Sequence, residues 1–171
     1  SEDNLPTVGA RIKSDEKEDT MSETAYAHTD MLPLLAARLR EEGLTCIIKT
    51  EDRTLTSRQS GIRPLLEWIA AGENVAGASA ADKIVGKAAA LLYVLMGVRE
   101  VWTEVLSESG LAVFKSHGIR AEYAHLTPRI INRAGTGICP MEETVLSISE
   151  PSEALAALKK TAARLRERST H

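Results

Sequence analysis

The stretch SAADKIVGKAAALLYVLMG, residues 79–97, decides how the rest of the chain is interpreted. Its alanines and leucines predict a helix that is buried on nearly every side and that begins with a capping box formed by Ser79 and Asp82. Within such a helix Lys83 and Lys87, four residues apart, lie on one stripe. Because a buried ammonium group is costly unless something pairs with it, this stripe predicts a binding site.

Three elements are predicted before this stretch. TDMLPLLAARLREEG, residues 29–43, has an apolar stripe and a terminal glycine typical of an amphipathic helix. Residues 44–58 contain two short β-rich runs around a polar turn, which predicts a hairpin. GIRPLLEWIAAG, residues 61–72, places its apolar residues at helical spacing and ends in glycine.

The elements predicted after residue 97 alternate between strand and helix. They are a strand at 98–106, a helix at 107–117, a strand at 119–126, an irregular segment to residue 139, a short helix starting at 140, and an amphipathic helix at 151–168. Strands separated by helices indicate right-handed crossovers, so we expect an α/β fold, a three-layer α-β-α sandwich with a mixed sheet. Ligands bind such sheets where helices begin after the strands. The three helix starts expected to lie at a ligand site are residues 79–83, 107–109 and 139–142.

The composition is that of an ordinary globular domain. With 171 residues, 43% of them hydrophobic and 26% charged, the chain suits one domain, which we place at residues 27–168. The two cysteines, Cys46 and Cys139, form no C-x-x-C motif, so neither a disulfide framework nor a thiolate zinc site is indicated. No apolar run reaches membrane-spanning length and no secretory leader is evident, so we expect a cytoplasmic protein without a membrane partner.

Charge is unevenly distributed along the sequence. Residues 1–23 hold seven acidic against three basic residues and few large apolar ones, which predicts a disordered acidic tail over residues 1–26. A basic cluster near the other end consists of Lys159, Lys160, Arg164, Arg166 and Arg168. We interpret this cluster as cations at a helix C-terminus rather than as a nucleic-acid patch, since acidic residues are interleaved across the domain.

Five short stretches carry a resemblance to a known family. GIRPLL, ADKIVGKAAALL, LSESGLAVFKSHGI, INRAG and CPME, in this order, resemble an uncharacterised prokaryotic family with a cytidine-deaminase-like fold. The resemblance covers residues 30–165. It implies a fold and a pocket, but no settled activity.

The same resemblance bears on zinc. Deaminases of this fold carry an H-A-E or C-A-E triplet at one helix start and a P-C-x-x-C motif at the next, and their His and Cys residues hold a zinc ion. Matched in order, these motifs fall on Ala81–Lys83 and Leu106–Ser109, where this sequence has neither histidine nor cysteine. We therefore expect no zinc and no other cofactor.

Candidate ligand-binding residues gather at the three helix starts and in the loop before the third. They are Ser79, Asp82, Lys83, Gly86, Lys87, Ser107, Glu108, Asn132, Arg133, Cys139, Pro140, Met141 and Glu142. The lysines would bind an anion with the help of free N–H groups. Ser107 is equally expected as a helix cap, and Asp82 as a helix-start acid. Cys139, at a helix start, has the position of a reactive thiol, although buried cysteines are usually inert.

Three functions follow from these candidates. The first is binding of a phosphate-bearing small molecule, a nucleotide or nucleotide-sugar, at the helix N-termini. The second is metal-free transfer or hydrolysis by Cys139 or Glu142 at the same crevice. The third is a non-catalytic interaction protein with a vestigial pocket that acts through oligomer or partner surfaces, in which case Lys87 should be tied to an internal carboxylate with no open cavity beside it.

Overall fold

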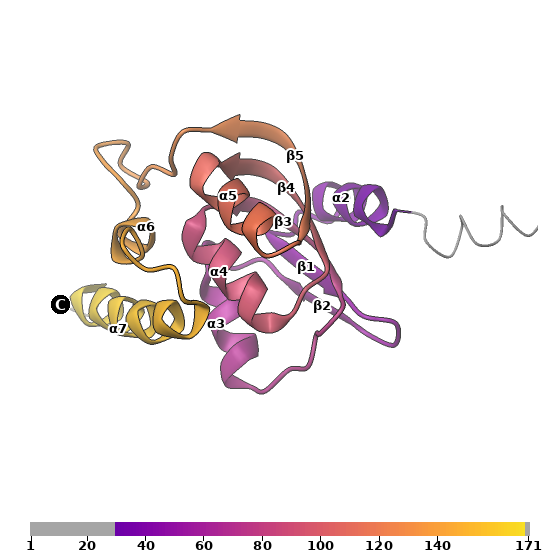
Figure 1. Ribbon diagram of the computed structural model, residues 1–171, viewed down its shortest axis with the longest axis horizontal. Coiled ribbons are helices and arrows are strands. Elements are labelled where there is room, and N and C mark those ends of the chain that lie inside the picture. Colours follow the sequence, from indigo (N-terminus) through magenta and orange to yellow (C-terminus); the bar gives the residue numbers. More distant parts are fainter. Residues whose placement is uncertain (1–29, 170–171) are drawn as a thin grey trace, which may run out of the picture. The chain divides into compact units, whose positions relative to one another are not determined.

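The computed structural model describes residues 30–169 (Figure 1), so the tail predicted at residues 1–26 lies outside the described residues. Helices and strands alternate along this part of the chain. The elements are α2 (Met31–Glu41), β1 (Cys46–Lys49), β2 (Thr54–Ser57), α3 (Arg63–Ala70), β3 (Ser79–Val85), α4 (Lys87–Met96), β4 (Glu100–Ser107), α5 (Glu108–Ser116), β5 (Arg120–Thr127), α6 (Pro140–Thr144) and α7 (Pro151–Ser169).

The strands form one mixed sheet in the order β2-β1-β3-β4-β5. β1 pairs antiparallel with both β2 and β3, whereas β3, β4 and β5 are parallel to one another. α4 connects β3 to β4 and α5 connects β4 to β5, as crossovers between parallel strands require. The predicted α/β class with a mixed sheet is confirmed.

Helices cover both faces of this sheet (Figure 1). On one face Ile48, Ala80 and Val101 join the core that α4 and α5 complete. On the other face lies α2, whose Arg40 guanidinium stacks 4.9 Å from the centre of the Trp102 ring. Successive residues of a strand point to opposite faces, so Val101 faces α4 and α5 whereas Trp102 faces α2.

The helix predicted over residues 79–97 is wrong in its first half. Residues 79–85 form β3, which lies between β1 and β4 at the centre of the sheet, and the helix begins only at Lys87. Lys83 and Lys87 therefore do not share a helical stripe. Ser79 does not cap a helix either, because its hydroxyl donates to Glu100 Oε2 at 2.5 Å.

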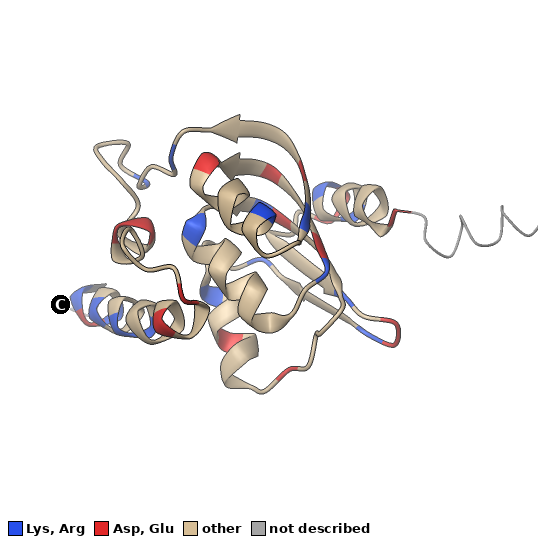
Figure 2. Ribbon diagram, viewed as in Figure 1, with Lys and Arg blue, Asp and Glu red and all other residues tan. Residues whose placement is uncertain are grey.

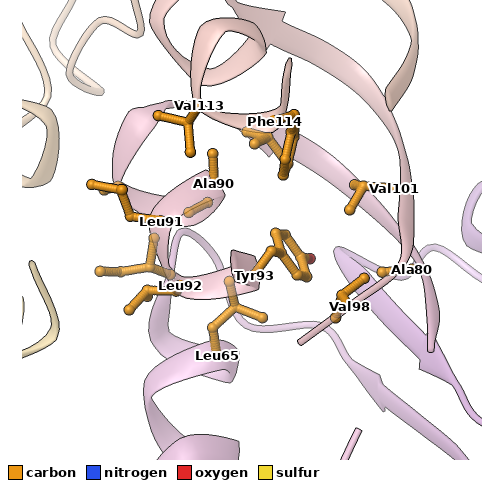
Figure 3. Packing of buried hydrophobic residues seen from close by; sticks show 14 of the residues in the cluster. Leu65, Ala80, Ala90, Leu91, Leu92, Tyr93, Val98, Val101, Val113 and Phe114 are labelled. Atoms are coloured by element: carbon orange, nitrogen blue, oxygen red, sulfur yellow. The ribbon is translucent and has the colours of Figure 1, made fainter. Parts of the chain in front are cut away.

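The second half of the stretch is the central helix that was expected. α4 is buried from Ala88 to Tyr93, since α3, α5 and α7 all pack against it. The Tyr93 ring lies among Phe114, Val98 and Leu65 (Figure 3). The helix ends at Gly97 in a left-handed conformation, as the sequence predicts.

Within residues 30–169, no helix is long and apolar enough to cross a membrane.

Candidate functional site at the start of helix α4

The starts of α4 and α5 lie side by side at the edge where β3 and β4 end. A side-chain carbon at Gly110 would stand 3.1 Å from the backbone carbon of Gly86, so the two glycines bring the two helix starts into close contact. In parallel sheets this edge is where ligands bind. Two of the helix starts that the sequence singled out therefore lie together at this edge, although the first of these helices starts at Lys87 instead of Ser79.

The carboxylate of Glu142 occupies the start of α4. Glu142 Oε1 accepts the backbone N–H of Lys87, and Oε2 accepts that of Ala88, both at 2.7 Å. A helix begins with backbone N–H groups that lack partners inside the helix, and their positive potential favours an anion. The protein supplies this anion from α6, and Glu142 is buried in doing so. The sequence predicted free N–H groups at a helix start at Ser79; the helix begins instead at Lys87, where Glu142 accepts two of these groups.

Gly86 makes room for this carboxylate. Its φ of −106° is available to any residue, so the backbone conformation does not require glycine. A side-chain carbon at position 86 would instead overlap the carboxyl group of Glu142. The predicted candidate Gly86 thus belongs to the site because of the space it leaves.

The side chain of Lys87 extends away from the buried part of α4. Its Nζ donates to the carbonyl oxygen of Leu146 at 3.1 Å, in the turn that follows α6. Lys87 is the only charged residue of α4 (Figure 2). Glu142 and Lys87 together fasten residues 140–150, which we call the strap, to the start of the central helix.

A shallow surface groove of about 360 Å³ runs beside Lys87. It is lined by Lys87, Ser109, Ala112, Val113, Ser116, His117 and Ser149. Four of these side chains, the three serines and the histidine, are polar and carry no fixed charge, so Lys87 is the one residue of the lining that is always cationic. The candidates predicted from the sequence do not include Ser116, His117 and Ser149. Ser116 and His117 lie near the end of the quoted stretch LSESGLAVFKSHGI, of which only the first residues are candidates, and Ser149 lies in a loop that no motif marks.

The start of α5 is capped locally. Ser107 Oγ accepts the backbone N–H of Gly110 at 3.0 Å, as expected of a capping serine, and lies 3.1 Å from Ser109 Oγ. Ser107 is buried, whereas Glu108 and Ser109 are exposed. Of this group only Ser109 reaches the groove.

Lys83 and Asp82 do not join Lys87. Lys83 is exposed on β3, where its backbone N–H donates to Thr45 across the pairing with the first strands. Asp82 is buried inside the sheet and makes neither a helix-start contact nor one to the groove. The structure therefore separates two residues that the sequence placed together with Lys87.

Asp82 instead belongs to a buried polar cluster that the sequence did not reveal. Its Oδ2 accepts the hydroxyl of Tyr93 at 2.6 Å, and the same hydroxyl lies 3.2 Å from Cys46 Sγ. Burial raises the pKa of Asp82 to about 7, while the Tyr93 hydroxyl and the N–H of Ile84 act against this rise. Burial and the charge of Asp82 also raise the pKa of the Cys46 thiol well above its usual value.

The loop before α6 is closed mainly on itself. Asn132 Oδ1 accepts the backbone N–H of Thr136 at 3.0 Å, and Ile131 forms a bridge with Ile138. Arg133 donates to the hydroxyl of Ser60, away from α4. Neither predicted loop candidate, Asn132 or Arg133, lines the groove.

The CPME turn contributes one residue to the site. Cys139 is half-buried, precedes α6 and makes no capping hydrogen bond through its thiol. Pro140 is exposed at the first helical position, and Met141 packs against the core. Glu142 is the residue of this turn whose side chain forms hydrogen bonds with α4.

The residues at these helix starts do not suit zinc. Because α4 starts at Lys87, the first deaminase triplet would fall there and not on Ala81–Lys83, and residues 85–89 contain neither histidine nor cysteine. The second motif does fall at the start of α5, without a ligand residue. Across residues 30–169, no group of three or more His, Cys, Asp or Glu side chains is arranged to hold a metal ion.

A family match covers the domain that carries this site. Residues 35–161 match a domain of unknown function, DUF1893. The chain belongs to the DUF1893 family. The crystal structure of the DUF1893 family protein TM1506 from Thermotoga maritima is similar, with a TM-score of 0.67 and 25% sequence identity over 73% of this chain and 85% of that one. No curated protein matches the sequence.

Membership confirms the uncharacterised family expected from the sequence. The match spans both helix starts and most of α7, so the strap that carries Glu142 is part of the family domain.

Proposed function

We propose that this DUF1893 protein binds a phosphate-bearing small molecule, a nucleotide or nucleotide-sugar, at the start of α4. The observation that carries the proposal is the carboxylate of Glu142 held by two backbone N–H groups at 2.7 Å. A phosphate offers the same kind of anionic oxygen acceptors with a larger charge. The site thus already accepts an anion, and Glu142 is the internal competitor for it.

The neighbouring groove suits the rest of such a ligand. Its volume of about 360 Å³ lies in the range of small-molecule sites. Ser109, Ser116 and Ser149 offer hydroxyl groups, and His117 a ring, within reach of a hydroxyl-rich ligand. Lys87 adds the fixed positive charge between the groove and the helix start.

Binding requires the strap to move. The ligand must replace two charge-assisted hydrogen bonds from Glu142, each worth about 1.5–3 kcal/mol, and the bond from Lys87 Nζ to Leu146. A doubly charged phosphate meets this demand better than a monoanion, because it gains from Lys87 and from the helix start together. The proposal therefore favours phosphates over carboxylates.

We also propose that the fold is cytidine-deaminase-like. The two helix starts that follow β3 and β4 support this, since they lie where that resemblance expects its motifs. The second function expected from the sequence, metal-free catalysis by Cys139 or Glu142, draws less support. Glu142 is engaged as a hydrogen-bond acceptor, and Cys139 has no neighbouring base among its hydrogen bonds.

A second candidate function is a non-catalytic interaction protein with a permanently closed pocket. It is favoured by the two hydrogen bonds that hold the Glu142 carboxylate at the helix start. Lys87 does not favour it, because its ammonium group donates to the carbonyl oxygen of Leu146 rather than to a carboxylate and a groove runs beside it. Under this alternative the carboxylate of Glu142 is a structural cap contributed from a distance, and no small molecule displaces it.

Titration calorimetry with inorganic phosphate, nucleoside mono- and diphosphates and a nucleotide-sugar separates the two candidates. Under the leading proposal, Glu142→Ala binds a member of this panel more tightly than wild type by about tenfold or more, because its competitor is gone. Lys87→Ala should weaken the same binding, and Glu143→Ala, a change at the exposed neighbour, should not alter it.

Amide chemical shifts of wild type provide a readout that needs no variant. The N–H resonances of Lys87 and Ala88 should move on titration with the best member of the panel. Unmoved resonances, together with no heat from Glu142→Ala, would favour the closed-pocket alternative.

A further inference from the structure

β5 (Arg120–Thr127) is a long, open edge of the sheet. It pairs with β4 on one side, and within residues 30–169 no strand pairs with its other side. All eight of its residues are exposed or half-buried, including Tyr123 at 40% and Leu126 at 44%. The opposite edge, β2 (Thr54–Ser57), has four residues. Proteins usually keep edge strands short or charged, because their free N–H and C=O groups pair with other chains.

The side chains of β5 do not alternate regularly between the two faces. Ala121 packs against the core together with its partner Val101, and Leu126 pairs with Leu106, which also lies in that core. Two residues five positions apart belong to opposite faces in a regular strand. The alternation is therefore interrupted once, as it is in β4, whose Val101 and Leu106 both lie in the core, and the pairing between the two strands leaves out Glu104 and Ala124.

This interruption makes the pattern of faces symmetric about the middle of the strand. Glu122 pairs with Trp102, which faces α2, and His125 precedes the core-facing Leu126, so Glu122 and His125 lie on the same face. When two antiparallel copies of β5 meet around the point between Tyr123 and Ala124, Glu122 lies opposite His125 of the second copy. The same register sets Ala121 opposite Leu126 of the second copy, both on the core face.

The pairs formed in this register are favourable. The imidazole of His125 has an N–H donor in either protonation state, and the carboxylate of Glu122 accepts it, twice by symmetry. Outside Arg120 and Glu122 the strand carries no charged residue (Figure 2), so no like charges meet across the axis. Arg120 donates to Glu100 at 3.1 Å and to Glu122 Oε1 at 2.5 Å, so it is Glu122 Oε2 that is left to accept the imidazole N–H of the second copy.

We propose that the β5 edge binds a second copy of this chain, which extends the sheet across a two-fold axis between Tyr123 and Ala124. The occupant is a second copy because the strand is complementary to itself, both in the faces of its residues and in the Glu122–His125 pair. This inference is independent of the ligand proposed at α4.

The test is the oligomeric state of the full chain, measured by light scattering and sedimentation. Wild type should be a dimer. His125→Glu, an exposed change that sets two carboxylates opposite each other at two places, should raise the dissociation constant about tenfold or more. The charge swap Glu122→Lys with His125→Glu should restore the affinity. Thr56→Glu, an exposed change on the other edge strand, is the matched control and should leave the dimer intact.

Hydrogen exchange gives a second readout that needs no variant. Amides within residues 120–127 should become more protected as the protein concentration rises through the dissociation constant. A monomeric wild type overturns the proposal. A dimer whose β5 amides gain no protection, or whose affinity ignores His125→Glu, overturns it as well.

Discussion

The carboxylate of Glu142 binds the backbone N–H of Lys87 at 2.7 Å across 55 positions of sequence. Together with the bond to Ala88 it satisfies two of the donors with which α4 begins. Side-chain caps usually come from the residue just before a helix, where α4 has Gly86, which has no side chain. The central helix thus depends on a distant segment for its cap.

Glu142→Ala should destabilise the protein by about 3 kcal/mol, because two N–H groups at a buried helix start lose a charged partner. Glu142→Gln should lose less, since the amide oxygen still accepts one bond. Urea unfolding measures both. Glu143→Ala is the control, and it should stay within about 0.5 kcal/mol of wild type because its side chain is exposed.

Gly86→Ala should cost about 2–3 kcal/mol, since the new methyl group displaces a carboxylate that two hydrogen bonds hold in place. In the Glu142→Ala background the same change should cost less than about 1 kcal/mol. A double-mutant cycle gives the coupling directly. Equal costs in both backgrounds would show that the methyl group meets some other obstacle. Gly137→Ala, at a glycine with open space around it, serves as control.

Asp82 should make the protein less stable as pH rises. Its pKa is raised from 3.8 to about 7 in the folded state, so between these values the native state holds a proton that the unfolded state releases. Its contribution is therefore fully present below pH 4 and is lost as pH approaches 7. A difference of about three pKa units corresponds to a loss on the order of 4 kcal/mol. The free energy of unfolding should be measured for wild type and for Asp82→Asn from pH 4 to 8. That of wild type should fall relative to that of the variant as pH rises, and parallel curves would contradict the prediction.

Tyr93→Phe should be costlier at pH 8 than at pH 5. The Tyr93 hydroxyl donates to Asp82 at 2.6 Å and lowers the pKa of that carboxyl, so its removal penalises the ionised form most. The difference between the two pH values should be about 1–2 kcal/mol. A pH-independent cost would mean that only packing is lost. The Tyr93 and Phe114 rings, 6.4 Å apart, remain together in this variant.

The two cysteines should differ sharply in reactivity. Cys46 is buried and the pKa of its thiol is raised, whereas Cys139 is half-buried beside α6. Iodoacetamide should label Cys139 in the folded protein and Cys46 at least about 100-fold more slowly, since exposing Cys46 requires the core to open. Mass spectrometry of the native and urea-unfolded protein counts the labels. Cys139→Ala should leave the folded protein unlabelled, and rapid labelling of Cys46 would contradict the buried cluster.

Amphipathic patterns predicted most of the fold. α2, the hairpin, α3, α5, β5 and α7 lie close to the expected residues, because their apolar spacing or turn chemistry is local. β3 was missed for the opposite reason. Ala80 and Ala81 favour a helix on their own. In the folded protein β3 lies between two strands and is covered by helices on both faces, where small side chains fit. The pair Ile84-Val85 before Gly86 was the available sign of a strand followed by a break.

The sequence predicted where the site lies but not which contacts its residues make. The sequence pointed to Lys87, Gly86 and Glu142 as members of one crevice, and the structure does bring them together. That Glu142 fills the crevice depends on how the strap folds back, and no local pattern encodes this contact. Lys83 and Asp82 were misplaced because the helix was started too early, so the buried cluster with Tyr93 was missed as well.

The distance between Glu142 and α4 also matters while the chain is being made. A ribosome adds residues one after another, so the first turn of the central helix has emerged long before residue 142 exists. Until then its leading amides face water. The cap of the central helix is accordingly completed only with the C-terminal segment, which also brings Val145, Ala154 and Leu158 to the core, and a nascent chain halted before α6 should keep a frayed end on this helix.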